Sequence, residues 1–299
     1  EQSKAPKWTG MGHEMIAFTH YYIVENGESF YLYAGESVPI EDFEVHRIRH
    51  NYKETSDDKA DWDRLMTAIT NGINGGEMTK VVSSREVEFT SDTPYNVASI
   101  LANLVDNNPN CFIFGYEKDG RTFVGASPEI LVRHRGSEIL SYALAGTAPK
   151  HGPKAWTKER LLRDKKNLFE HNIVRDRIVN TMKQITPDVT VGETGIMELS
   201  HLYHLRTIIT AKDSTKSLVE WAKLLHPTPA LGGEPREKAM ALLETYEAHE
   251  RGMYAAPFGF MKDMGDGIVV VAIRSALIID NILYAYAGCG VVDDSDADV

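Results

Sequence analysis

Four charged residues occupy positions where an apolar residue would be expected: Lys80, Glu129, Glu170 and Arg274. Lys80 opens a short apolar strand, and Glu129 lies in a tight connection between two apolar strands. Arg274 interrupts the most apolar run of the chain, so its guanidinium must meet a carboxylate of the protein or of a bound ligand. Together, a lysine, two acids and an arginine indicate a site for a small anionic substrate.

Each of these residues also has an ordinary structural explanation. Lys80 fits a surface lysine at a strand end, and Glu129 fits a carboxylate that caps a turn. Glu170 extends the stripe that Val174 and Ile178 form at four-residue steps on a predicted helix, so we expect it to face the interior of the protein. A carboxylate on a buried stripe needs a cation, and a metal ion or an arginine would serve.

Other common motifs for chemistry are incomplete in this sequence. His201 and His204 are three residues apart and could share a metal ion, but no third ligand lies near them in the sequence. His13 lacks the second histidine of the zinc-protease pattern. Cys111 and Cys289 are far apart, and we expect both to be small core residues.

The elements that must hold these residues are a mixture of β-hairpins and helices. Alternation and turn residues predict a hairpin at 16–32 with its turn at Glu25-Asn26-Gly27, a loop at 41–60, and strands at 80–84, 111–116, 121–126, 130–134, 139–144, 268–279 and 282–287. Apolar spacing predicts helices from an Asp61 cap to Gly75, over 158–184, over 217–225, and from Pro235. This order favours an α+β fold in one domain over a doubly wound parallel sheet.

Composition excludes several classes of protein. The 299 residues are 42% hydrophobic and 25% charged, as in a folded globular chain, and the net charge of -11 argues against nucleic acid or an anionic membrane as a partner. No apolar run is long enough for a transmembrane helix, and no apolar stretch follows Glu1, so we expect neither a transmembrane helix nor a signal peptide. Two cysteines fit a reducing compartment, so we expect a cytoplasmic protein.

Eight segments, in order, resemble the chorismate-utilising enzymes, the family of isochorismate synthase, salicylate synthase, anthranilate synthase component I and aminodeoxychorismate synthase component I. The segments are Lys80-Val81-Val82-Ser83-Ser84-Arg85, Phe123-Val124-Gly125-Ala126-Ser127-Pro128-Glu129, Leu144-Ala145-Gly146-Thr147, Glu170-His171, His226-Pro227-Thr228-Pro229-Ala230, Arg251-Gly252-Met253-Tyr254, Ala272-Ile273-Arg274 and Ala287-Gly288-Cys289-Gly290-Val291-Val292. The resemblance implies one α+β domain over residues 1–299, in which two large antiparallel β-sheets pack together and are flanked by helices.

Two positions discriminate between activities within this family. In the aminating members the place of Lys80 is usually a glutamine, and the aminodeoxychorismate type has a nucleophilic lysine at the place of Ala145. Lys80 with Ala145 therefore implies water as the nucleophile. The resemblance is strongest to the bacterial isochorismate synthases of menaquinone biosynthesis. Salicylate synthase is the alternative, and anthranilate or aminodeoxychorismate synthase component I is a more distant one. A non-catalytic chorismate-binding domain or a glutamine-amidotransferase-coupled subunit is a different class of hypothesis.

The resemblance also implies a role for each site residue. Lys80 is the general base and must be desolvated, while Glu129 is the general acid and must hold a proton near neutral pH. Glu170 holds Mg²⁺, which neutralises a substrate carboxylate. Arg274 binds a carboxylate of chorismate. The remaining substrate-binding positions are Gly146, Thr147, Ala230 and Gly288, with His204 near the substrate ring.

The resemblance sets expectations for the partners and the chain ends. The partners are chorismate and isochorismate, with no nucleic acid or membrane, and the protein is a monomer or a weak homodimer. Family members carry strands before the position of Glu1, and after that of Val299 a helix with a second Mg²⁺-binding glutamate and a substrate-binding lysine. We therefore expect this chain to be part of a longer enzyme, with an incomplete metal site by itself and without tight Mg²⁺ binding or full activity.

Overall fold

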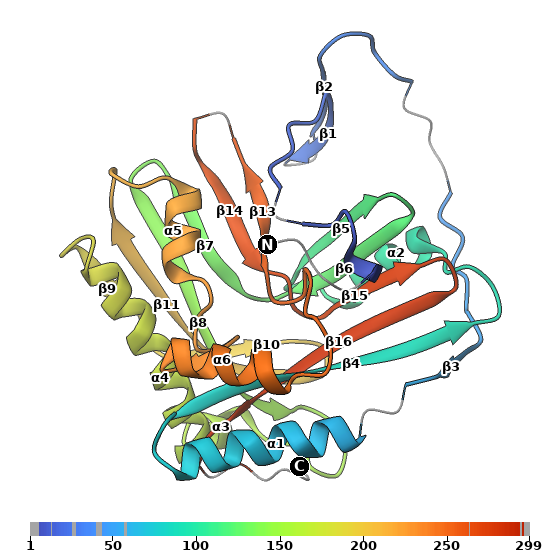
Figure 1. Ribbon diagram of the computed structural model, residues 1–299. Helices are drawn as coiled ribbons and strands as arrows, with labels where there is room; N and C mark the ends of the chain where they lie inside the picture. The colour runs from blue at the N-terminus through green and yellow to red at the C-terminus, as the bar shows by residue number, and fades with distance from the viewer. Residues whose placement is uncertain are drawn as a thin grey trace.

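A computed structural model describes residues 6–12, 14–25, 28–39, 44–56, 59–262, 264–293 and 295. Its main body is two seven-stranded antiparallel sheets (Figure 1). Sheet I has the order β10-β11-β8-β7-β14-β13, with β9 paired to β11, and sheet II has the order β12-β4-β16-β15-β6-β5, with β3 paired to β4. The predicted α+β fold with two large antiparallel sheets is confirmed.

The strands of sheet I are β7 (Ile130–Arg135), β8 (Glu138–Pro149), β9 (Val189–Val191), β10 (Gly195–Glu198), β11 (Leu202–Lys212), β13 (Pro257–Met261) and β14 (Gly267–Val271). The strands of sheet II are β3 (Tyr52–Glu54), β4 (Lys80–Ser91), β5 (Phe112–Lys118), β6 (Arg121–Ser127), β12 (Gly233–Glu234), β15 (Ser275–Ile279) and β16 (Ile282–Val291). One hydrophobic cluster takes side chains from both sheets, with Leu131 and Val271 from sheet I and Phe123 and Leu277 from sheet II. The two sheets therefore share a core.

Helices cover the outer faces of the sheets. The helices are the 3-10 helix η1 (Pro6–Trp8), α1 (Lys59–Asn74), α2 (Val97–Asn107), α3 (Lys158–Leu161), α4 (Lys165–Lys183), α5 (Leu218–Leu225) and α6 (Arg236–Tyr246). Helix α4 packs on β8 and β11, whereas α1 packs on β4 and α6 around Ile69 and Leu243. Within the described ranges, no helix combines the length and apolar character needed to cross a membrane.

The predicted strand over 268–279 is wrong, because this run divides between the two sheets. Its first half, β14, pairs with β7 and β13, while its second half, β15, pairs with β6 and β16. Arg274 lies in the link between them, at a φ of 56°. Continuous apolar sequence cannot reveal such a break, because both halves are buried in sheets. Arg274 therefore does not interrupt a strand but lies at a crossing between the sheets.

The predicted helix over 158–184 is also broken. Its first turn is α3, and Asp164 then caps α4 by accepting a hydrogen bond from the backbone N–H of Asn167 at 2.9 Å. This cap satisfies a backbone N–H group in the first turn of α4, which has no partner within the helix. A new helix therefore begins after Asp164. Asp61, predicted as a cap, lies inside the first turn of α1, which begins at Lys59.

Other differences are that helix α2 and strands β9 to β13 were not predicted, and that some predicted elements differ in extent. The short strand predicted at 80–84 continues to Ser91, and the predicted loop at 41–60 contains β3. The predicted N-terminal hairpin is formed by β1 (His20–Glu25) and β2 (Glu28–Tyr33), which project from the main body (Figure 1). Its turn residues Asn26 and Gly27 lie outside the described residues.

Candidate active site

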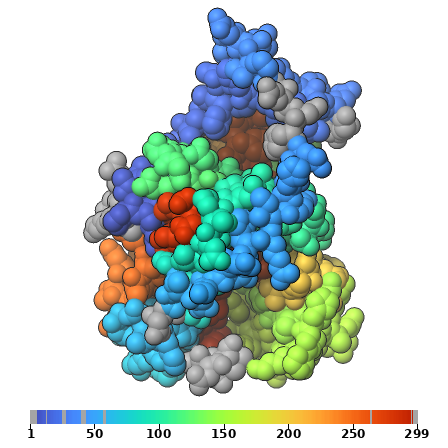
Figure 2. All heavy atoms as spheres, turned by 90° about the vertical axis from the view of Figure 1, so that its right-hand side faces the viewer, coloured from blue at the N-terminus to red at the C-terminus, as the bar shows by residue number. Residues whose placement is uncertain are grey.

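A cavity with a volume of about 980 Å³ lies between the two sheets and α4. It is lined by β4 and β16 of sheet II, by β8 and β11 of sheet I, and by the link around Arg274. Figure 2 shows a hollow low on one face, between α1 and the segment around α3. The residues predicted for the site all line this cavity: Lys80, Glu129, Gly146, Thr147, Glu170, His204, Ala230, Arg274 and Gly288.

Lys80 and Glu170 form an ion pair in the cavity. The Nζ atom of Lys80 lies 3.0 Å from Oε1 of Glu170, and the side chain of Lys80 is only 1% exposed. Lys80 is the first residue of β4 and pairs with Glu234 of the short strand β12, which shields it from solvent. The explanation of Lys80 as a surface lysine is therefore wrong, and its predicted desolvation is confirmed. The partner of Glu170 is a lysine rather than an arginine.

Gly290 makes room for this ion pair. A Cβ atom at Gly290 would clash with Oε1 of Glu170 and would lie 3.0 Å from Cε of Lys80. Because β16 pairs with β4, its backbone at Gly290 lies close to both charged groups. The absence of a side chain at this position therefore sets how close the strand approaches the ion pair.

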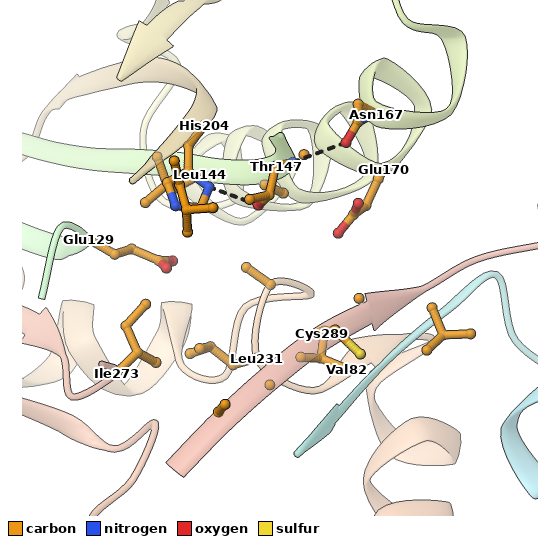
Figure 3. A pocket seen from close by; sticks show the side chains of 18 of the residues that line it. Val82, Glu129, Leu144, Thr147, Asn167, Glu170, His204, Leu231, Ile273 and Cys289 are labelled. Carbon is orange, nitrogen blue, oxygen red and sulfur yellow. Dashed lines mark hydrogen bonds between the residues drawn. The ribbon is translucent and has the colours of Figure 1, made fainter. Parts of the chain in front are cut away.

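Glu129 is a buried acid that points into the same cavity (Figure 3). It is 2% exposed, and its Oε1 atom has no hydrogen-bond partner among the described residues. Burial raises the pKa of Glu129 to about 8, against the opposing effect of the positive charge of Lys80. The carboxyl group is therefore protonated near neutral pH, as the sequence predicts. Glu129 does not cap its turn with this side chain; instead its backbone N–H donates to Oγ of Ser127 at 3.2 Å.

A hydrogen-bond chain connects Arg274, His204 and Thr147. Nη2 of Arg274 lies 2.7 Å from Nε2 of His204, and Nδ1 of His204 lies 2.8 Å from Oγ1 of Thr147 (Figure 3). Because arginine only donates, Nε2 of His204 must accept and Nδ1 must carry the proton that it donates to Thr147. Burial, together with the charge of Arg274, lowers the pKa of His204 to about 3, so this histidine is neutral.

The charge of Arg274 is therefore not neutralised by its protein neighbours. Its partner His204 is uncharged, and within the part of the chain that the structure describes no carboxylate forms an ion pair with Arg274. A buried guanidinium without a counter-charge favours binding of an anion. Of the two partners predicted for Arg274, the structure supports a ligand carboxylate over an internal one.

Backbone groups line the rest of the cavity. Gly146 has a φ of 78°, and a Cβ atom there would lie 2.9 Å from the carbonyl oxygen of Asn167. Ala230 lies in the turn before β12, where its N–H donates to Oγ1 of Thr228 at 3.2 Å. At Gly288 a Cβ atom would lie 2.6 Å from Oη of Tyr254. The two predicted glycines thus allow neighbouring groups of the cavity wall to approach the backbone closely.

Four cavity residues were missed or misjudged from the sequence. Tyr254, whose pKa is raised to about 12 by burial, offers a neutral hydroxyl, and Asn167 accepts at 3.0 Å from the backbone N–H of Thr147. Arg251 also lines the cavity. Tyr254 and Arg251 both lie in a segment that supports the family resemblance, which is the signal that could have identified them. Cys289 was expected in the core but is exposed in the cavity, beside Ser83.

Comparison with known proteins agrees with the fold. The family model for chorismate binding enzymes matches residues 32–299, and the chain belongs to this family. It is 37% identical over 245 residues to isochorismate synthase MenF of Bacillus subtilis, covering 80% of this chain and 52% of that protein. It is 32% identical over 249 residues to the salicylate biosynthesis isochorismate synthase of Pseudomonas aeruginosa, covering 81% and 52%.

A solved structure is similar over most of the chain. The menaquinone-specific isochorismate synthase MenF from Escherichia coli aligns with a TM-score of 0.75 and 29% sequence identity, covering 87% of this chain and 61% of that chain. The chain spans about half the length of the two curated relatives above. The activity of the complete protein is therefore a proposal, which the geometry of the cavity supports.

Proposed function

We propose that the complete protein is an isochorismate synthase, which converts chorismate to isochorismate by attack of water at C2 and loss of the C4 hydroxyl. The observation that carries this proposal is that a buried Lys80 and a buried, protonated Glu129 line the same cavity. Ala145 supports water as the nucleophile, since an aminodeoxychorismate-type enzyme would have a lysine at this position. We further propose that residues 1–299 form one catalytic domain.

The reaction needs one proton acceptor and one proton donor. Lys80 accepts a proton from the water whose oxygen bonds to C2, and Glu129 gives a proton to the hydroxyl that leaves C4 as water. One water enters and one leaves, so the product is an isomer of the substrate. Glu129 is buried and its Oε1 atom has no hydrogen-bond partner among the described residues, which suits a proton donor, whereas Lys80 is ion-paired with Glu170 and must be released from this pair to act as the base.

Substrate carboxylates are bound by the positive side of the cavity. Arg274, held by neutral His204, offers donors to one carboxylate. Thr147 accepts from His204, so its hydroxyl proton is free to donate into the cavity. Backbone groups at Gly146, Ala230 and Gly288 allow close approach of the ligand.

Replacement of Arg274 by glutamine should raise KM for chorismate about 10- to 100-fold, because the charge-assisted hydrogen bonds to a carboxylate are lost. Steady-state kinetics of the complete protein measure this effect. The matched control is Arg133→Gln on the exposed face of β7, for which KM should stay within about twofold of the wild-type value. An unchanged KM in Arg274→Gln would show that Arg274 binds no substrate carboxylate.

Magnesium is the cofactor that we propose, with Glu170 as the ligand from this chain. Mg²⁺ keeps several waters and takes one or two carboxylates together with substrate oxygens, so a single glutamate at the cavity fits the chemistry of the ion. The described residues contain no group of three or more potential metal ligands, so the proposed site would need the substrate or further residues to complete it. When bound, the ion neutralises the charge of a substrate carboxylate. In the structure Lys80 neutralises Glu170.

The metabolic pathway, the cellular location and the oligomeric state of the enzyme are also proposals. The resemblance to MenF proteins supports menaquinone biosynthesis. Salicylate synthase is the second candidate for the activity, while the relative named for salicylate biosynthesis is itself named an isochorismate synthase. We propose a cytoplasmic enzyme that acts as a monomer or weak homodimer.

Chromatography of the products formed from chorismate and Mg²⁺ tests the proposed activity. We expect isochorismate as the product. Enzyme-dependent salicylate and pyruvate would instead establish salicylate synthase. Anthranilate formed from ammonia would contradict the assignment of water as the nucleophile. A stable partner protein without turnover would support a non-catalytic or amidotransferase-coupled subunit.

A further inference from the structure

One edge of β4 has no partner strand just beyond Val82. Strand β12 is only two residues long and pairs with Lys80 and Val81, after which the N–H of Val82 donates to the carbonyl of Gly232 at 2.8 Å. On this side β4 is next paired with β3, beginning at Phe89. The backbone groups of β4 just after Val82 therefore need hydrogen-bond partners that no strand supplies.

The side chains of Arg251 and Glu247 supply these partners. Nη2 of Arg251 donates to the carbonyl of Val82 at 2.7 Å, and Oε1 of Glu247 accepts from the backbone N–H of Ser84 at 2.8 Å. A neighbouring strand would satisfy the same donor and acceptor. The two side chains thus take the place of a strand at the open edge of β4.

Arg251 also holds the turn that precedes β12. Its Nη1 donates to the carbonyl of Leu231 at 2.6 Å, and Leu231 lies beside Val82 on one side of the cavity (Figure 3). The turn closes through a 3.0 Å hydrogen bond from the N–H of Leu231 to the carbonyl of Thr228, and it contains Ala230. One guanidinium therefore connects the strand of Lys80 to the turn of Ala230.

The two charged groups also bind each other. Nε and Nη2 of Arg251 donate to Oε2 and Oε1 of Glu247 at 2.8 and 2.6 Å, in the bidentate geometry that only arginine can provide. Their side chains are 17% and 6% exposed, so this pair is largely removed from solvent. Loss of the arginine would leave a buried carboxylate without its counter-charge.

We propose that Arg251, oriented by Glu247, is a positioning residue that fixes the turn 228–232 against β4 and so sets the shape of the substrate site between Ala230 and Lys80. Strand β4 is also held by β16 along its other edge, whereas the turn is bonded to other elements through Arg251 and Val82, in addition to the burial of Leu231 in the core. Loss of the hydrogen bonds of Arg251 should therefore increase the mobility of the turn and not that of β4. The kinetic part of this inference rests on the proposed function; the structural part does not.

Arg251→Lys tests the inference, because an ammonium cannot make the bidentate bond and also reach both carbonyl groups. We expect the backbone amides of Leu231 and Gly232 to exchange with solvent at least about tenfold faster, while amides of β6 exchange at the wild-type rate. KM for chorismate should rise at least about tenfold and kcat should change less than about threefold. Arg47→Lys, at an exposed ion pair with Asp106, is the matched control and should change neither quantity.

Arg251→Ala combined with Glu247→Gln removes both charges, so it tests the role without leaving a buried carboxylate. The same pattern of faster exchange in the turn supports the inference. Unchanged exchange and KM in both variants, with only a lower midpoint of unfolding, would overturn it. If the wild-type protein does not turn over chorismate, the proposed function fails, and the exchange rates still decide whether Arg251 holds the turn.

Discussion

Lys80→Ala should lower kcat for chorismate at least about 10³-fold, because the variant lacks the group that accepts the proton of the attacking water. Chorismate should still bind, with a Kd within about tenfold of the wild-type value, since Arg274 and the backbone groups of the cavity remain. Steady-state kinetics and calorimetric titration measure the two quantities on the same preparation. The expected result is a variant that binds its substrate without converting it.

Lys223→Ala is the control for this variant, because Lys223 is exposed on α5 and far from the cavity lining. It should retain wild-type kinetics. The removal of Lys80 also leaves Glu170 without the partner seen in the structure, so unfolding must be measured for both variants. A folded Lys80→Ala protein that retains more than about a tenth of the wild-type kcat would exclude Lys80 as the general base.

Glu129→Gln should lower kcat about 10²- to 10⁴-fold, because an amide cannot protonate the departing hydroxyl. In the wild-type protein the acid must hold its proton, so activity should decline as pH rises through about 8, the value to which burial raises the pKa of Glu129. The residual activity of Glu129→Gln should lack this decline. The exposed Glu244→Gln variant on α6 should reproduce the wild-type pH profile.

The same substitution has an expected effect on stability with a definite sign. The pKa of Glu129 is raised on folding, so the folded state holds this proton more tightly, and the stability that the proton contributes is present at low pH and lost as pH rises toward 8. Glutamine does not titrate, so the stability of Glu129→Gln does not decline with pH for this reason. The variant should therefore gain stability relative to wild type between about pH 5 and pH 8, by a few kcal/mol at most in urea unfolding. If the free energies of unfolding of Glu129→Gln and wild type differ equally at about pH 5 and pH 8, Glu129 is ionised in the folded protein at both pH values.

The fold class could be predicted because alternation and apolar spacing report on burial, and both sheets are buried on their inner faces. The pairs β5 with β6 and β7 with β8 follow directly from two apolar runs separated by turn residues. The crossing at Arg274 could not be predicted, because it depends on which strands β14 and β15 pair with. Pairing partners far apart in the sequence leave no local signal in an apolar run.

The site residues could be chosen because they are charged where apolar residues were expected, but the sequence could not pair them. The ion pair between Lys80 and Glu170 joins β4 to α4, and the bond between Arg274 and His204 joins the link between β14 and β15 to β11. Arg251 was not predicted because two of its three partners are backbone carbonyls, and every residue type has a backbone carbonyl. Sequence thus indicates which groups are unusual, and packing decides what each one contacts.

Attack of water at C2 is the central claim, and turnover of chorismate in H₂¹⁸O tests it most directly. Mass spectrometry of isochorismate collected early in the reaction should find one ¹⁸O atom, located on the C2 hydroxyl, because the new C–O bond forms from solvent and the C4 oxygen leaves. Isochorismate that retains the original oxygen of the substrate would contradict this account, since the hydroxyl would then have moved within the molecule without a water nucleophile.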